Sequence, residues 1–226
     1  MKWVVAGLVV IIAVAVGAWW YEGYHAASTL LKLPIYRVLK EHDRPLFDEL
    51  VSEYRVYQRD EERPEQYVNF ASEKISLVAT RSLAHASQES VLALVRDMLA
   101  TGRRLQLRPG DQCFRFWFPL VSGPPDIAQA VDAQTQAHTL DLMSEVIRSA
   151  AESPVTPPAA DAVKDNLADI VNGTYEQFGA DAQMLGHAED PRVDRIKVCA
   201  ITIGFYERVL RLPPERATAL IRVMAQ

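Results

Sequence analysis

An uncharged stretch near the start of the chain limits most strongly what this sequence can fold into. Residues 3–20 form a run of 18 residues without a charged side chain, about the length that a helix needs to cross the hydrocarbon core of a bilayer. Trp3 stands at one end and the Trp-Trp-Tyr run of residues 19–21 at the other, where aromatic rings favour the headgroup region. The stretch therefore predicts a single membrane-spanning helix.

The charges around this stretch predict its orientation. Lys2 and the amino group precede it and Glu22 follows it, so the positive-inside rule keeps the N-terminus in the cytoplasm and exports the rest. We expect residues 1–25 to form a membrane anchor with its tether and residues 26–226 to form an exported helical domain. This predicts a single-pass protein of a bacterial inner membrane with its C-terminal domain in the periplasm.

A cleaved signal peptide is the alternative interpretation of the same stretch. Residues 4–14 are short enough for the core of a signal peptide, and Val-Gly-Ala at residues 16–18 offers the small side chains that a signal peptidase accepts. Cleavage there would leave Trp-Trp-Tyr as the new N-terminus, and the apolar run continues through the site, which favours an uncleaved anchor. Both interpretations export the remaining residues.

Charge and composition narrow the partners and the fold class. Without Lys2, 23 Lys and Arg residues stand against 29 Asp and Glu residues, so the exported part carries a net charge near −6. An acidic domain gains nothing from a phosphate polyanion, which argues against nucleic acid as a partner. Only 10 glycines occur, and alternation of apolar and polar residues is hard to find beyond the first stretch. We expect an all-α fold.

The first half of the exported part shows the start and stop signals of helices. Pro34, Pro45 and Pro64 stand where three helices are expected to begin, because proline is tolerated in a first helical turn. Ser87 is expected to cap the next helix, and Gly102 to end it.

The second half shows helical spacing as well. We expect a long helix over residues 126–152, whose middle is polar on nearly all sides, and a helix over residues 158–178 that Gly179 ends. A further helix is expected over residues 192–210. Residues at helical spacing in the last two are expected to face inward: Val163, Leu167, Ile170, Val171, Tyr175, Phe178, Ile196, Cys199, Ala200, Ile203 and Leu210. The sum is a bundle of about seven or eight helices.

One segment between these halves breaks the helical pattern. Residues 103–119 carry four arginines and four aromatics, and we expect an irregular loop there. In an extended chain the three phenylalanines would share one side and Arg115 and Trp117 the other. Arginine and aromatic residues are enriched at protein interfaces. The candidate partner-binding residues are Arg103, Arg104, Arg108, Arg115 and Trp117. The alternative is that the three phenylalanines complete the core and Arg115 pairs with a surface acid. A mixed outcome would place the phenylalanines inward, with Trp117 and Arg103, Arg104 and Arg108 pointing outward.

The two cysteines predict a disulfide. Cys113 and Cys199 are the only cysteines, and two cysteines in an exported domain more often pair than remain free. They enclose about 86 residues, for which the chain-entropy model gives roughly 4 kcal/mol of stabilisation. Their separation matches neither a redox motif nor a metal-ligand spacing.

Catalytic and metal-binding patterns are weak. His138, Asp141 and Glu145 share one helical face, where such a triplet is usually solvated, so we predict neither a metal nor a cofactor. The run Gln88-Glu89-Ser90 resembles the Glu-Ser pair of goose-type lysozymes and lytic transglycosylases. That resemblance implies a glutamate acting as general acid on peptidoglycan. The Gly-Leu-Met-Gln-like segment of that family is absent, and an acid at a helix N-terminus explains Glu89 as well.

Three functional hypotheses follow from this pattern. The first is a non-enzymatic protein whose exported domain binds another envelope protein, as an immunity or inhibitor protein or as an assembly factor would. The second is a wall-acting hydrolase or lytic enzyme that uses Glu89. The third is a ligand-binding sensor that uses the polar middle of the long helix.

Overall fold

The fold is described from a computed structural model, which covers residues 25–59, 64–123, 125 and 131–226. The membrane helix predicted over residues 3–20 lies outside these ranges, as do residues 126–130 of the expected long helix. Within them lie ten complete α-helices and two 3-10 helices, besides a helical stretch at residues 25–30, and no strand. The all-α prediction is thus confirmed for the described residues, and the helices there outnumber the seven or eight expected.

The helices of the described ranges were also compared with the requirements for crossing a bilayer. None of them is both long enough and apolar enough to span a membrane.

The chain divides into two compact units, with the boundary between Lys74 and Ile75. The first unit contains α2 (Pro34–His42), α3 (Arg44–Arg59) and the first part of α4 (Pro64–Leu83). The three prolines stand in the first turns of these helices, as predicted. Within the unit, the hydroxyl oxygens of Tyr36 and Tyr67 lie 3.0 Å apart, and Lys74 forms an ion pair of 2.8 Å with Glu49.

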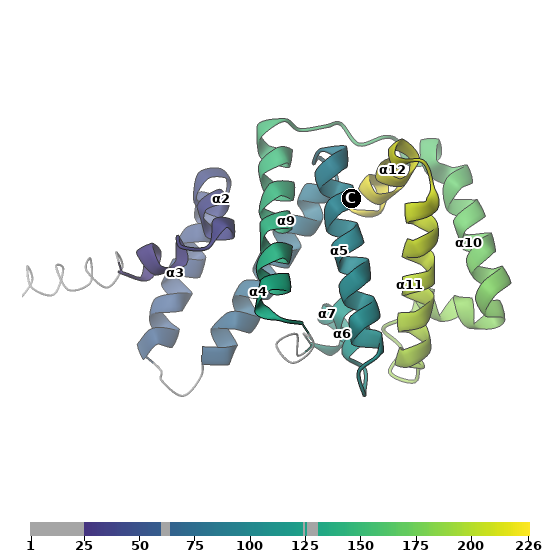
Figure 1. The fold of residues 1–226 in the computed structure, drawn as a ribbon, viewed down its shortest axis with the longest axis horizontal. Coiled ribbons are helices and arrows are strands. Elements are labelled where there is room, and N and C mark those ends of the chain that lie inside the picture. Colours follow the sequence, from purple (N-terminus) through teal and green to yellow (C-terminus); the bar gives the residue numbers. More distant parts are fainter. Residues whose placement is uncertain (1–24, 60–63, 124, 126–130) are drawn as a thin grey trace, which may run out of the picture. The chain divides into compact units, whose positions relative to one another are not determined.

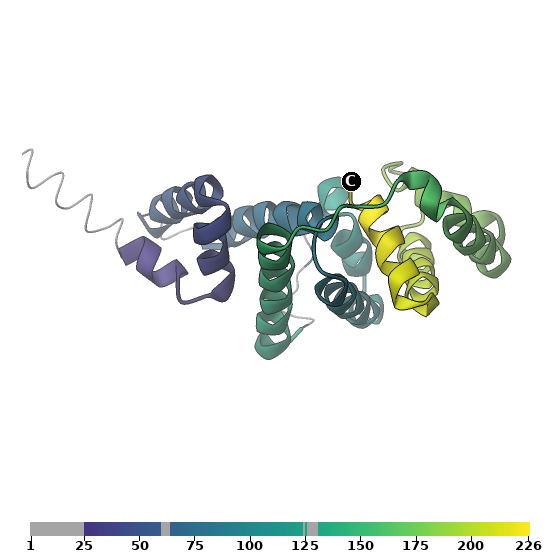
Figure 2. The ribbon, with the colours of Figure 1, turned by 90° about the horizontal axis from the view of Figure 1, so that it is seen from above.

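The second unit holds the remaining helices. They are α5 (Gln88–Gln106), α6 (Gln112–Trp117), α7 (Pro119–Ser122), α9 (Ala133–Glu152), η1 (Ala160–Val163), α10 (Lys164–Phe178), η2 (Gly179–His187), α11 (Arg195–Arg211) and α12 (Pro214–Met224). Helices α9, α5, α11 and α10 follow one another in a row in both views, and each packs against the next (Figures 1 and 2). Helix α12 packs on α5 and α11 and helps to bury the main core, which includes Val91, Leu94, Val146, Val209 and Leu220.

Local sequence signals set several of these helix ends. Ser87 caps α5 as predicted, since its hydroxyl oxygen accepts a hydrogen bond of 3.2 Å from the backbone N–H of Ser90. Gly179 follows α10 with φ of +60°, a backbone conformation that favours glycine. The expected start of the long helix at residue 126 is wrong, because Asp132 caps it and α9 begins at Ala133.

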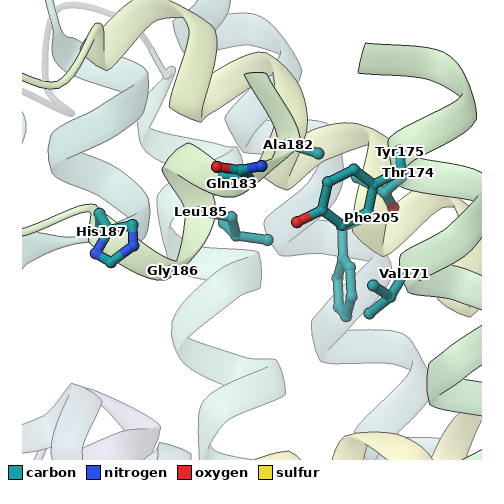
Figure 3. A pocket seen from close by; sticks show the side chains of 9 residues that line it. All are labelled: Val171, Thr174, Tyr175, Ala182, Gln183, Leu185, Gly186, His187 and Phe205. Carbon is teal, nitrogen blue, oxygen red and sulfur yellow. The ribbon is translucent and has the colours of Figure 1, made fainter. Parts of the chain in front are cut away.

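The inward-facing stripe predicted for α10 is wrong in part. Val171 and Tyr175 keep 37% and 42% of their surface exposed, although Ile170 is buried among the core residues. The reason is that Val171 and Tyr175 border a hollow instead of a packed neighbour. Between α10, η2 and α11 a hollow of about 550 Å³ remains, with Phe205 of α11 among its lining residues (Figure 3).

Candidate partner surface beside the disulfide

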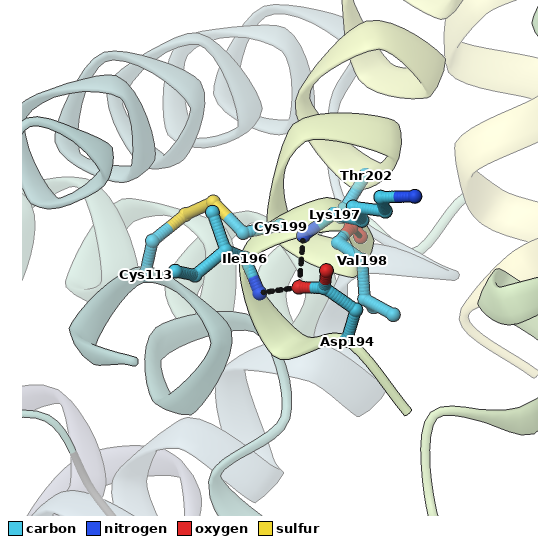
Figure 4. The surroundings of a disulfide bond; sticks show 7 residues. All are labelled: Cys113, Asp194, Ile196, Lys197, Val198, Cys199 and Thr202. Carbon is cyan, nitrogen blue, oxygen red and sulfur yellow. Dashed lines mark hydrogen bonds between the residues drawn. A yellow bond between two sulfur atoms is a disulfide. The ribbon is translucent and has the colours of Figure 1, made fainter. Parts of the chain in front are cut away.

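The predicted disulfide is confirmed and joins α6 to α11. The Cα atoms of Cys113 and Cys199 lie 5.8 Å apart (Figure 4). Both residues are buried with Leu99, Leu105 and Ile203. The segment that follows α5 is therefore attached covalently to the middle of the second unit.

The Arg/aromatic segment is helical, so the expected extended loop is wrong. Gly110, at φ of +80°, turns the chain after α5, and the backbone N–H of Arg115 then donates to the carbonyl oxygen of Asp111 to open α6. Helical spacing places Phe114 and Phe118 on one face, where their rings stack at 5.0 Å. Phe114 is completely buried against Ala188 and Val198, so it completes the core.

Trp117 does not point outward, contrary to the sequence-based expectation. Its indole stacks on the ring of Tyr206 at 4.9 Å and lies against Gly102 of α5. A Cβ atom at Gly102 would come within 2.9 Å of the indole Nε1, so only glycine leaves room for this ring. This packing also explains why the prediction that Gly102 ends the helix is wrong: the glycine serves a contact, and α5 continues to Gln106.

Asp111 ties this region together through two arginines. Its carboxylate accepts hydrogen bonds from Arg115 at 2.8 Å and from Arg195 of α11 at 2.6 Å. The Arg195 guanidinium also lies 5.2 Å from the centre of the Phe114 ring, a cation–π contact. Partial burial by itself would raise the pKa of Asp111, but the two arginines outweigh it, so that pKa lies below its ordinary value. Arg115 is thereby engaged within the fold.

The other predicted arginines differ in how they are held. Arg103 forms an ion pair of 2.7 Å with Glu207 of α11. Arg104 donates a long hydrogen bond of 3.4 Å to Thr135 of α9. Arg108 lies exposed in the turn between α5 and α6. The structure therefore brings Arg103, Arg108 and Arg115 to the disulfide end of α5 and α11, whereas Arg104 faces α9.

Two apolar residues that sequence reasoning did not select are exposed in this region. Leu107 keeps 86% of its surface exposed, and Ile196, which was expected to face inward, keeps 65%. Ile196 and Gln106, the neighbour of Leu107, line one shallow recess together with the disulfide. The only sequence signal was an apolar residue at position 107 between two polar ones. Ile196 carries no such signal, because it fits the helical stripe of α11.

These residues share one side of the unit by helical geometry. Leu107 follows Arg103 by four residues and directly continues α5 with helical backbone angles, and Ile196 precedes Glu207 by three helical turns on α11. The Arg103–Glu207 ion pair joins the two helices, so Leu107 and Ile196 extend from the same two faces. We call this set, Arg103, Leu107, Arg108 and Ile196, the disulfide-side surface.

The start of α11 is also fixed locally. The Asp194 carboxylate accepts hydrogen bonds of 3.1 Å from the backbone N–H groups of Ile196 and Lys197, which caps the helix (Figure 4). Ile196 therefore stands on a capped helix end one turn before the disulfide. Its exposed side chain sits on a rigid base.

The remaining sequence-predicted candidates lie elsewhere. Glu89 is exposed in the first turn of α5 and lines neither the recess nor the hollow beside α10. His138, Asp141 and Glu145 are exposed on α9. In the part of the chain that the structure covers, no three His, Cys, Asp or Glu side chains are placed to hold a metal ion.

No protein-family model, no curated protein and no solved structure matches the chain.

Proposed function

We propose that the second unit is a protein-binding domain and that a partner docks on the disulfide-side surface. The exposure of Leu107 at 86% and of Ile196 at 65% carries this proposal. Single exposed apolar residues are ordinary, but here one of the two lines a recess, the other adjoins a residue that lines it, and the arginines 103 and 108 accompany them. An apolar centre with a charged rim is the composition of many protein interfaces.

The rigidity of the base supports the same proposal. The disulfide, the two hydrogen bonds to Asp111 and the Trp117–Tyr206 stack hold α5, α6 and α11 together. A surface that is already ordered loses little conformational entropy when a partner binds, so more of the contact energy appears as affinity.

The cellular location and the role that we propose follow from the sequence. The apolar stretch at residues 3–20 anchors the protein in a bacterial inner membrane, and the helical domain meets another envelope protein in the periplasm, without enzymatic activity. An anchor raises the effective concentration of the domain near the membrane. An immunity or inhibitor protein, or an assembly factor, acts in this way. The wall-acting alternative gains no support from these two pockets, because Glu89 stands exposed and lines neither the recess nor the hollow beside α10.

Photo-crosslinking in the native cells tests the proposal. A photoreactive amino acid replaces Arg108 in the full chain, and the cross-linked products are compared in two backgrounds. Leu107→Asp with Ile196→Asp places charges on the surface. The matched control, Val56→Asp with Val68→Asp, makes the same change at side chains that are 56% and 60% exposed in the first unit.

We expect one discrete cross-linked product that disappears in the first background and persists in the control. Circular dichroism of both variants checks that each is folded. A product of equal intensity in both backgrounds, or no product from the folded chain, contradicts the proposal.

A further inference from the structure

We propose that the hollow between α10, η2 and α11 is a binding site for a small, uncharged and mainly apolar molecule of about the size of one or two aromatic rings. This site is separate from the disulfide-side surface, although α11 contributes to both. The sequence analysis did not single it out, because Val171 and Tyr175 were expected to be core residues.

The size of the hollow suits a small molecule. Its volume of about 550 Å³ falls within the range of about 300–1,000 Å³ that is typical of small-molecule sites. An extended peptide would need a longer groove, with backbone groups or side-chain pockets along it.

The chemistry of the lining selects an uncharged ligand. Nine residues line the hollow, and none of them is Asp, Glu, Lys or Arg. Val171, Leu185 and Phe205 supply apolar walls, and Gln183 and His187 offer polar groups on η2 (Figure 3). An ionised ligand would lose water here without gaining an opposite charge, whereas an apolar ring replaces water at no such cost.

The elements around the hollow are joined to one another by contacts that do not involve the lining side chains. Arg208 of α11 donates a hydrogen bond of 2.9 Å to Gln177 of α10, and Lys197 forms an ion pair of 2.7 Å with Asp181 of η2. The Phe178 ring at the end of α10 lies against Gly204 of α11. The hollow is therefore formed before any ligand enters, which lowers the cost of binding.

Photolabelling of the full chain tests this site with a neutral aromatic probe, 3-trifluoromethyl-3-phenyldiazirine. The labelled positions are mapped by mass spectrometry, with and without an excess of trifluoromethylbenzene as competitor. Val171→Asp adds a charge to the wall at an exposed position. Asn172→Asp is the matched control, since it adds the same charge on the next residue of α10, which is exposed and does not line the hollow.

We expect saturable labelling at Val171, Tyr175, Leu185 or Phe205 that the competitor suppresses. Val171→Asp should lower it about tenfold, because a carboxylate must be desolvated when a ring packs on it, and Asn172→Asp should leave it unchanged. Labelling that does not saturate, that spreads evenly over the chain, or that responds equally to both substitutions overturns the proposal. So does a dimer in mass measurements that Val171→Asp dissociates, because the occupant would then be a second copy of the chain.

Discussion

The two sides of α11 share one kind of contact, an aromatic ring packed on a glycine, but they differ in how completely they are covered. Toward α5 and α6, the Trp117 ring lies against Gly102, and toward α10, the Phe178 ring lies against Gly204. In both contacts a glycine inside a helix accepts an aromatic ring. The first side is also cross-linked by the disulfide and by Asp111, whereas the second is joined by exposed polar contacts and leaves a hollow of about 550 Å³.

This difference shows why one side of α11 is fully packed and the other leaves a hollow. An aromatic ring fills the space beside one helical turn, but it does not bring together the turns on either side of it. On the first side α6 covers those neighbouring turns. On the second side η2 also packs on α11, but a hollow remains between α10, η2 and α11, and the apolar residues Val171 and Tyr175 of α10 are left partly exposed. We infer that the covered side contributes more to stability and the open side more to ligand binding.

The largest expected effect on stability comes from removing the disulfide that links α6 to α11. Replacing both cysteines by alanine should lower the free energy of unfolding by about 4 kcal/mol, because the bridge closes a loop of 86 residues. Urea unfolding of the full chain, followed by circular dichroism, measures this loss. Reductant should destabilise the wild type by a similar amount and leave the double variant unchanged. A loss below about 1 kcal/mol would mean that packing alone holds α6 in place.

The second test compares the two glycine contacts directly. Gly102→Ala and Gly204→Ala should each lower the free energy of unfolding by about 1–3 kcal/mol, since the new Cβ atoms would lie 2.9 Å and 2.7 Å from a ring atom. The same urea titration gives both values. We expect the larger loss at Gly102, where the disulfide prevents α6 from moving away with its tryptophan.

Gly173→Ala is the control for these substitutions. It lies inside α10, and its Cβ atom would come no closer than 3.3 Å to Arg208, a long side chain that also donates hydrogen bonds to Gly173 and Gln177 and would have to shift by only a few tenths of an ångström. Alanine is the better helix former, so this variant should be neutral or gain up to about 1 kcal/mol. Equal losses at all three glycines would show that the ring contacts are not the cause.

The smallest expected effect concerns Asp111. Asp111→Asn keeps the shape of the side chain but removes the charge that pairs with Arg115 and Arg195. We expect a loss of about 1 kcal/mol at neutral pH, because the pair is partly exposed to solvent. The folded-state pKa of Asp111 lies below its ordinary value, so this stabilisation is complete above about pH 4 and is lost as the pH falls through the folded-state pKa.

Urea titrations at several pH values measure this dependence. The difference in stability between the wild type and Asp111→Asn should shrink as the pH is lowered below about 4. A stability difference that stays constant down to pH 2 would show that the charge of the Asp111 carboxylate does not stabilise the fold.

The disulfide of the candidate site was predictable from the sequence, but the arrangement of the segment around it was not. The pairing of Cys113 with Cys199 followed from their number and the expected compartment, and the disulfide-linked segment was correctly singled out as unusual. Its internal arrangement was not predicted. The ring of Trp117 is partly buried because it packs on Gly102 and Tyr206, which are 15 and 89 residues away from it in the sequence.

The sequence by itself determined the helical class and many helix ends, because proline, serine and glycine act on the backbone within a few residues of where they stand. Ser87 and Gly179 are examples. Which apolar residues remain exposed was decided only by the tertiary structure. Ile196 and Val171 fit their helical stripes as well as buried residues do, and their exposure depends on where another helix stops covering them. Burial depends on contacts between distant segments, and helical periodicity does not contain that information.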